Sequence, residues 1–153
     1  MMTDPHRNVG FLIRSVSRLW AKTFERRASD LHLSLAQCKV LATLSRNQGT
    51  SQARLADLAD TDPMALVRTL DRMEQDGWIE RQPDPADRRA HRLYLRTTAE
   101  PVLNRIWEIS DQSRSEALSA LSPAERDQLV NLLERVQTAL SPQDVRASDS
   151  DAR

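Results

Sequence analysis

Arginines gather in one short window of the chain. It holds Arg88, Arg89, Arg92 and Arg96 together with His91, and it contains no acidic residue. Because electrostatic screening extends over only about 8 Å at physiological salt, this local density of positive charge matters more to a nearby phosphate backbone than the charge of the whole chain. A charge run of this kind also suits an ordinary solvated surface. The window therefore leaves two alternatives open, a contact for nucleic acid and a plain polar face.

The zero net charge of the chain conceals an uneven distribution. The 153 residues include 22 Lys and Arg and 22 Asp and Glu, a balance that by itself argues against a nucleic-acid partner. Residues 1–30, however, hold six basic and three acidic side chains, whereas residues 99–153 hold six basic and ten acidic ones. The neutral total arises because an acidic C-terminal third offsets a positive N-terminal segment and the arginine window.

The sequence offers little for catalysis, and an enzyme is the class it argues against. His6, His32 and His91 are far apart, and the chain has no Gly-x-Ser-x-Gly, His-x-x-x-His or paired-cysteine motif. Cys38 and His32 are a conceivable nucleophile pair, but their six-residue spacing spans a helix start and suits that role poorly. With only three glycines the chain lacks the loops that cradle nucleotide phosphates. The single cysteine excludes an intramolecular disulfide and a multi-cysteine metal centre, so we expect no metal or cofactor.

Length and apolar runs limit the architecture further. A chain of 153 residues is expected to form one domain with a core of its own. Its apolar runs are too short to span a membrane, and its first residues lack the apolar stretch of a signal peptide. The sequence therefore predicts a soluble cytoplasmic protein.

Long amphipathic helices are predicted towards both ends of the chain. Apolar residues recur every three or four positions and predict a helix over about residues 9–30. Two pairs of residues have the spacing of capping boxes and predict the starts of two further helices. These pairs are Thr97 with Glu100, and Ser122 with Glu125.

Shorter elements are predicted between the long helices. Two helices, over residues 34–49 and 51–59, each begin at a serine that can cap its first amides. A third, over residues 62–76, begins with an aspartate N-cap followed by a proline and ends at a glycine. The period then changes to two, which predicts strands over residues 78–82 and 92–95 with a proline-containing turn between them.

The third of these helices has two distinct faces. Leu66, Leu70 and Met73 fall on one face and are expected in the core. At about 100° per residue the opposite face follows from the spacing alone. It carries Met64, Ala65, Arg68, Arg72 and Gln75.

This order of elements predicts a mainly α fold, a winged helix-turn-helix with a short β-hairpin wing. The major groove of DNA, about 12 Å wide, admits one α-helix whose N-terminal residues then face the base edges. The preceding helix braces it across the backbone, and the hairpin tip can reach the neighbouring minor groove. A helix-turn-helix corner also occurs in proteins that do not bind DNA, so a winged-helix protein-interaction module is the alternative.

Three runs of residues, at 66–74, 77–81 and 87–95, resemble the MarR family of bacterial transcriptional regulators. They read Leu-Val-Arg-Thr-Leu-Asp-Arg-Met-Glu, Gly-Trp-Ile-Glu-Arg and Asp-Arg-Arg-Ala-His-Arg-Leu-Tyr-Leu. The resemblance covers about residues 9–140, and the Leu-Val-Arg-Thr-Leu-Asp run is most similar to the SlyA branch. It implies a homodimer that binds an inverted-repeat operator, commonly as a repressor, and that a small lipophilic or phenolic effector releases.

The resemblance also implies how the chain is divided. Residues 1–33 would form an N-terminal dimerisation helix and residues 34–97 the winged helix-turn-helix domain. Residues 98–140 would form C-terminal dimerisation helices. The polar composition of residues 141–153 predicts a disordered tail.

Matched to the family's motifs, individual residues acquire expected roles. Arg68 corresponds to the arginine that reads base edges, and an arginine can donate two hydrogen bonds to guanine. Asp71 either repels phosphate or holds Arg68 from three residues away. In the wing, one arginine would enter the minor groove while Asp87 orients the arginine pair. The full set of expected DNA-binding residues is Ser51, Gln52, Pro63, Met64, Ala65, Arg68, Thr69, Arg72, Asp87, Arg88 and Arg89.

An effector site is expected beside Trp20, Phe24, His32 and Cys38, which lie on elements that flank the family's ligand pocket. The same residues also suit core packing. No cluster of cations is visible there, so the expected effector is small and aromatic or lipophilic. A thiol switch at Cys38 is an alternative, although the peroxide-sensing members carry their cysteine near the start of the first helix, where residues 9–17 have none.

Overall fold

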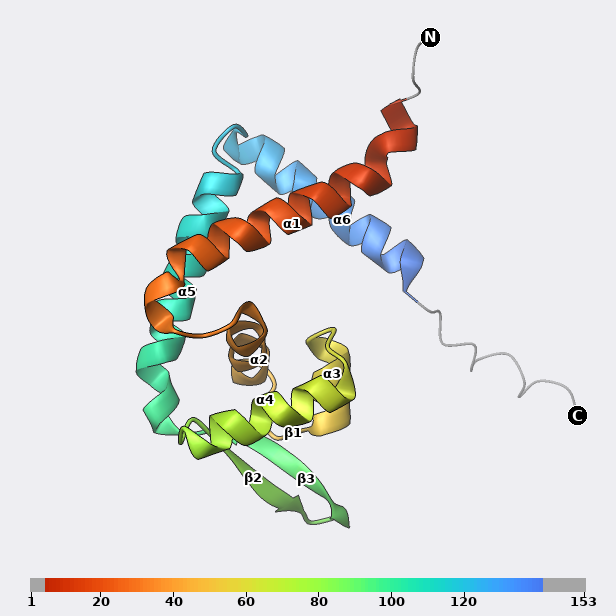
Figure 1. Ribbon diagram of the computed structural model, residues 1–153. Helices are drawn as coiled ribbons and strands as arrows, with labels where there is room; N and C mark the ends of the chain where they lie inside the picture. The colour runs from red at the N-terminus through yellow and green to blue at the C-terminus, as the bar shows by residue number, and fades with distance from the viewer. Residues whose placement is uncertain (1–4, 142–153) are drawn as a thin grey trace, which may run out of the picture. The chain divides into compact units, whose positions relative to one another are not determined.

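The computed structural model describes residues 5–141, and its elements confirm a mainly α winged helix-turn-helix (Figure 1). The predicted disordered tail lies, from residue 142 onward, outside the described residues. The described chain divides into two compact units between Ser115 and Glu116, near the end of α5. The α-helices are α1 (Val9–Arg27), α2 (Leu35–Ser45), α3 (Gln52–Leu58), α4 (Pro63–Gln75), α5 (Glu100–Ala117) and α6 (Pro123–Leu140). The strands are β1 (Thr50–Ser51), β2 (Ile79–Asp84) and β3 (Asp87–Leu95), and the 3-10 turns are η1 (Pro5–Asn8), η2 (Ser29–Leu31) and η3 (Thr97–Ala99).

Side-chain caps fix the starts of the helices that were predicted from them. In α2 the amide of Gln37 donates to Ser34 Oγ at 3.1 Å, and the Gln37 side chain accepts from the Ser34 amide at 2.9 Å. In α4 the amide of Ala65 donates to Asp62 Oδ2 at 2.9 Å. Ser51 caps α3 in the same way. Each cap satisfies backbone donors that a helix start would otherwise leave unpaired.

The start of α5 differs from the prediction. The capping box between Thr97 and Glu100 is wrong, because η3 precedes the helix and places Thr97 within a 3-10 turn. The hydroxyl of Thr98 instead donates to the backbone carbonyl of Gly77. The side chain that secures this corner is therefore the neighbouring threonine, and it binds the turn after α4.

The wing has one strand more than the sequence predicts. Strands β2 and β3 pair antiparallel with Ile79 opposite Leu95, and β1 adds to the other edge of β3 with Thr50 opposite Leu93. A strand of two residues is too short to show an alternating pattern, and for this reason β1 was not predicted from the sequence. Gly49 leads into β1 at φ 81°, where an added Cβ would lie 3.1 Å from the Tyr94 hydroxyl oxygen. Both the backbone conformation and the available space therefore favour glycine.

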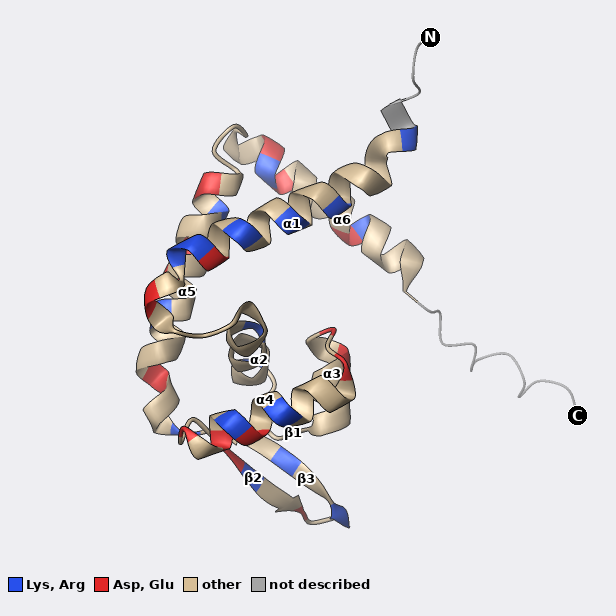
Figure 2. Ribbon diagram, viewed as in Figure 1, with Lys and Arg blue, Asp and Glu red and all other residues tan. Residues whose placement is uncertain are grey.

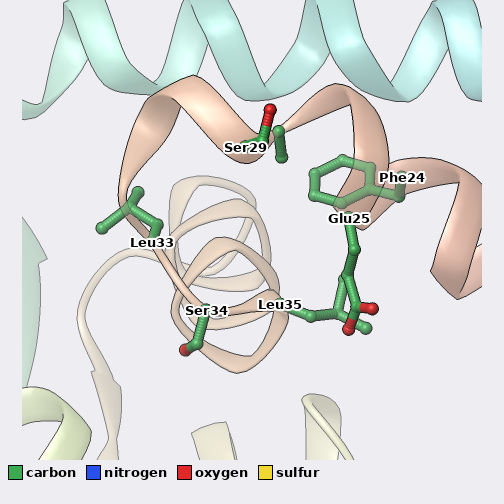
Figure 3. A pocket seen from close by; sticks show the side chains of 7 residues that line it. Phe24, Glu25, Ser29, Leu33, Ser34 and Leu35 are labelled. Atoms are coloured by element: carbon green, nitrogen blue, oxygen red, sulfur yellow. The ribbon is translucent and has the colours of Figure 1, made fainter.

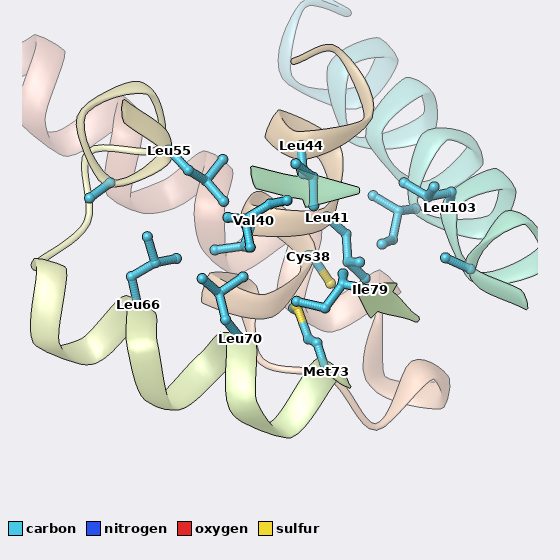
Figure 4. Close-up of a cluster of buried hydrophobic side chains, with 14 residues drawn as sticks. Cys38, Val40, Leu41, Leu44, Leu55, Leu66, Leu70, Met73, Ile79 and Leu103 are labelled. Carbon is cyan, nitrogen blue, oxygen red and sulfur yellow. The ribbon is translucent and has the colours of Figure 1, made fainter. Parts of the chain in front are cut away.

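A single hydrophobic core holds α4 in place (Figure 4). Leu66, Leu70 and Met73 are fully or almost fully buried, as predicted, and they pack in the same cluster as residues of the other elements. Burying a side chain of this size contributes about 1.5–3 kcal/mol. The cluster also includes Leu41 and Leu44 of α2, Leu55 of α3, Ile79 of β2, Leu93 of β3, and Leu103 and Ile106 of α5. The inner face of α4 is thus anchored from several sides, and its opposite face is left to solvent.

Helices α1 and α6 are exceptional because neither contains a buried residue. Phe11 of α1 is 75 % exposed and Leu140 of α6 is 80 % exposed. Each helix nevertheless has an apolar stripe at helical spacing. The exposed members are Val9, Phe11, Leu12, Ile13, Val16 and Leu19 on α1, and Val130, Leu132, Leu133, Val136 and Leu140 on α6. No helix within residues 5–141 is long and apolar enough to cross a membrane.

Candidate nucleic-acid interface

The N-terminal half of α4 exposes an arginine, Arg68, that has no partner within the described residues. Asp62 caps the helix and Pro63 occupies its first position. Arg68 lies on the exposed face and makes no hydrogen bond or ion pair with any residue in the described range 5–141. An arginine has five N–H donors in a rigid planar fork, and all five are available here. Met64, one turn before it, is 72 % exposed.

Two other polar residues of α4 are already bonded within the helix. The Thr69 hydroxyl donates to the Ala65 carbonyl at 3.1 Å. Arg72 lies 3.5 Å from Asp76 in an ion pair whose arginine side chain is 70 % exposed. An exposed pair of this kind is weak, so Arg72 remains able to approach a phosphate.

One of the two roles expected for Asp71 was to hold Arg68 in position. In the structure Asp71 binds a different arginine. Its Oδ1 atom accepts a hydrogen bond at 2.7 Å from Arg81 of β2, and Glu74 accepts a second one from the same guanidinium. The Nε of Arg81 also donates to Gln52 Oε1 at 2.9 Å. Arg81 therefore joins α3, α4 and the wing, and its positive charge lies between the two carboxylates of α4. We call these four residues the Arg81 cluster.

Sequence reasoning did not single out the Arg81 cluster, although the sequence contained a signal for it. In a strand alternate side chains share a face, so Arg81 lies on the same face as the buried Ile79. An arginine at the edge of a core face needs acidic partners. Asp71 and Glu74, three residues apart on one helix, could have been matched to it.

The wing carries its arginines at the tip of the hairpin, where Figure 2 shows blue. Arg88 and Arg89 are exposed and make no ion pair within the described chain. Asp87 Oδ1 accepts from the backbone amide of Arg89 at 3.0 Å. The aspartate thus shapes the backbone at the tip in this structure.

One arginine of the wing is partly neutralised across the hairpin. Arg92 Nε lies 3.3 Å from Asp84 Oδ2. The pKa of Asp84 is lowered, first because the amide of Ala86 donates to its carboxylate and then because of the Arg92 guanidinium. Arg88, Arg89 and Arg96 remain as the cations of the arginine window with no acidic partner in the described residues.

A pocket of about 270 Å³ lies where α1 passes through η2 into α2 (Figure 3). Of the four expected effector residues, Phe24 lines it. The other lining residues were not singled out from the sequence, because a pocket at a bend depends on how the chain turns. They are Glu25, Ala28, Ser29, Leu33, Ser34 and Leu35.

Trp20, His32 and Cys38 are not among the lining residues. Trp20 is half-buried on α1, whereas His32 is exposed and closes η2 in the left-handed conformation. Cys38 is 2 % exposed and belongs to the hydrophobic core. Burial raises the pKa of its thiol to about 11, which opposes formation of the reactive thiolate. Within the described residues no group of three or more His, Cys, Asp or Glu side chains could hold a metal ion.

Comparison with known proteins agrees with this arrangement. The sequence model of the MarR family matches residues 33–91, which contain α2, α3, α4, β2 and the start of β3. The crystal structure of a mutant of the E. coli MarR protein is 28 % identical, covers 90 % of this chain and 99 % of its own, and superposes with a TM-score of 0.76. Residues 33–91 thus resemble the MarR family in sequence, and the described chain has the fold of the E. coli MarR protein.

Two further solved structures resemble this chain. One is the same E. coli mutant in complex with operator DNA, with 27 % identity, a TM-score of 0.75 and coverage of 88 % of this chain and 99 % of the other. The other is Bordetella bronchiseptica BpsR, whose DNA binding is regulated by 6-hydroxynicotinic acid. It shows 25 % identity, a TM-score of 0.76 and coverage of 90 % of this chain and 98 % of its own.

Proposed function

We propose that this protein is a transcriptional regulator of the MarR family and binds an inverted-repeat operator in double-stranded DNA, with α4 in the major groove. The observation that carries the proposal is the unpaired guanidinium of Arg68 on the exposed face of α4, in the half of the helix that would meet base edges. Pro63, Met64 and Ala65 lie on the same N-terminal turns, and Arg72 would contact phosphate. The complex of the E. coli relative with operator DNA supports this assignment.

The wing would contact the neighbouring minor groove. Narrow A·T-rich minor grooves have an enhanced negative potential that attracts arginine. Arg88 and Arg89 are exposed at the hairpin tip, and Asp87 supports the backbone between them. Ser51 and Gln52, at the start of α3, would help to position the corner against the DNA backbone.

The protein would act as a homodimer. The apolar stripes of α1 and α6 are each exposed in the single chain, and an exposed apolar stripe along a helix is typical of an interface. A two-fold dimer places two recognition helices about 34–36 Å apart, which is one turn of the duplex. In this proposal residues 1–33 and 98–140 form the dimer, and residues 34–97 bind DNA.

A small aromatic effector would release the DNA. The pocket beside Phe24 has a volume of about 270 Å³, close to the lower end of the range of ligand sites and suited to a single ring. BpsR, whose effector is a hydroxylated aromatic acid, supports the chemical class. Trp20, His32 and Cys38 lie on adjoining elements and would contribute if the pocket extends on binding.

Two finer assignments complete the proposal. The Leu-Val-Arg-Thr-Leu-Asp run at residues 66–71 supports the SlyA branch. Action in the cytoplasm follows from operator binding, because that is where an operator would be reached.

Selection of bound sequences from a random DNA library tests the proposal. The expected result is an inverted repeat with half-sites about one helical turn apart, bound with a steep dependence on salt. Failure to enrich any sequence would favour the protein-interaction module instead. Repeating the selection after peroxide treatment addresses Cys38, because a thiol switch would abolish enrichment of the operator.

A further inference from the structure

The exposed face of α4 is unusually poor in free hydrogen-bonding groups where it would meet the bases. Arg68 is its one unpaired arginine in the first two turns. Around it lie Met64, which is 72 % exposed, Val67, which is 39 % exposed, and the exposed Ala65. A side chain as exposed as that of Met64 contributes little to the stability of the hydrophobic core.

The polar neighbours that could also read bases each have one hydrogen-bonding group already engaged within the protein. The Thr69 hydroxyl hydrogen is donated to the Ala65 carbonyl at 3.1 Å. Gln52 and Asp71 both accept from Arg81. The reading face therefore combines one strong donor group with a cluster of apolar groups.

The major groove offers one apolar feature, the C5-methyl group of thymine. A methionine side chain is flexible and polarisable, and it adapts to such a contact. We infer that Met64 reads the methyl group of a thymine adjacent to the guanine read by Arg68. This inference rests on the proposed function, since it needs α4 in the major groove.

The spacing of the two residues limits where that thymine lies. Met64 and Arg68 are four residues apart, which is about 6 Å along a helix axis and about 40° around it. Successive bases of one strand are about 3.4 Å apart. The thymine therefore lies within about two base pairs of the guanine in each half-site.

The experiment replaces single thymines of the selected operator by deoxyuridine, which lacks only the methyl group. Affinity is measured by fluorescence anisotropy for the full-length wild-type protein and for Met64→Gln, which keeps the side-chain length and changes an exposed position. Loss of one buried methyl corresponds to about a fourfold fall in affinity. We expect that fall for the wild type at one thymine per half-site, and less than twofold for Met64→Gln.

Two controls separate the contact from indirect effects. Deoxyuridine at thymines outside the half-sites should leave wild-type affinity unchanged. Gln75→Ala, at the far end of the same face of α4, should keep the wild-type discrimination between thymine and uracil.

The outcomes distinguish this inference from the proposed function. If a specific operator is selected but no half-site thymine is sensitive, or if Met64→Gln retains the sensitivity, the role of Met64 is refuted and operator binding stands. If no sequence is selected, both fail together.

Discussion

Arg81 of β2 places its Nη2 atom 2.7 Å from Oδ1 of Asp71 on α4. The arginine side chain is 15 % exposed, whereas the aspartate side chain is 55 % exposed. Glu74 and Gln52 complete the Arg81 cluster from the same helix and from α3. The wing and the helix-turn-helix are therefore joined by a largely buried cation as well as by the core.

Replacing Arg81 by Met should destabilise the protein by about 1–3 kcal/mol. The change leaves two carboxylates of α4 without their cation, but the carboxylates are half-exposed, so the loss falls below that of a fully buried pair. Urea unfolding followed by circular dichroism measures it. Arg92→Met is the control, since Arg92 is 45 % exposed and pairs within the described residues with Asp84 only, and this variant should lose less than about 1 kcal/mol of stability. Equal losses in the free energy of unfolding would show that the Arg81 cluster stabilises the protein no more than an exposed ion pair does.

Replacing Arg68 by Ala should lower affinity for the selected operator about five- to 150-fold, because a bidentate contact to guanine contributes about 1–3 kcal/mol. Affinity for random DNA should change little. Anisotropy titrations on both duplexes at matched salt measure the two constants. Arg72→Ala is the matched control on the same helix, expected to weaken both duplexes alike and to lower the salt slope by about one. If Arg68→Ala weakens both duplexes equally, Arg68 is no base reader.

Asp84 should contribute to stability near neutral pH and lose that contribution in acid. Its pKa is lowered in the folded protein by the Ala86 amide and the Arg92 guanidinium, so the charged form is favoured by folding. The contribution is present above the unfolded pKa of about 4 and disappears as the pH falls through the lower folded value. Asp84→Asn should therefore be less stable than wild type at pH 7, with the gap closing in acid. Urea midpoints measured across this range check it, and a gap independent of pH would contradict the assignment.

Cys38 should react slowly with alkylating reagents. Its pKa of about 11 leaves about one thiol in ten thousand ionised at pH 7. Its side chain is only 2 % exposed, so the core also shields the sulfur sterically. Iodoacetamide labelling followed by mass spectrometry should be at least about a hundredfold slower for the native protein than in urea. Native labelling as fast as in urea would restore the thiol switch as a candidate.

Ending the chain after Leu121 should convert a dimer into a monomer. This truncation removes α6, which has no buried residue in the single chain. Size-exclusion chromatography with light scattering gives the mass directly. In the full-length chain Val136→Asp should weaken the dimer, whereas the control Gln128→Asp, a polar position of the same helix, should not. A truncated protein that stays dimeric would place the interface elsewhere.

Much of the fold could be predicted because its signals are local. The Asp62 cap, the proline after it and the spacing of Leu66, Leu70 and Met73 determine where α4 begins and which face it buries. The missed features depend on contacts between distant residues. Strand β1 exists because Thr50 reaches Leu93, and Thr98 bonds to Gly77 rather than capping α5.

The candidate site divides in the same way. The exposed residues of α4 and the wing tip follow from helical spacing and from the turn, so the sequence predicts which residues can meet DNA. Whether each is free depends on tertiary partners. Gln52 and Asp71 accept hydrogen bonds from Arg81, which lies on a strand later in the chain. The residue periodicity of α3 and α4 does not predict these hydrogen bonds.

The two faces of α4 separate two kinds of evolutionary change. Leu66, Leu70 and Met73 hold the helix in the core, while Met64 and Arg68 are exposed to solvent. Substitutions at such surface positions usually alter stability by less than about 0.5 kcal/mol. In the proposed function, changes at a few solvent-facing residues of one helix would therefore give a lineage a new operator, and so a new set of regulated genes, on an unchanged scaffold.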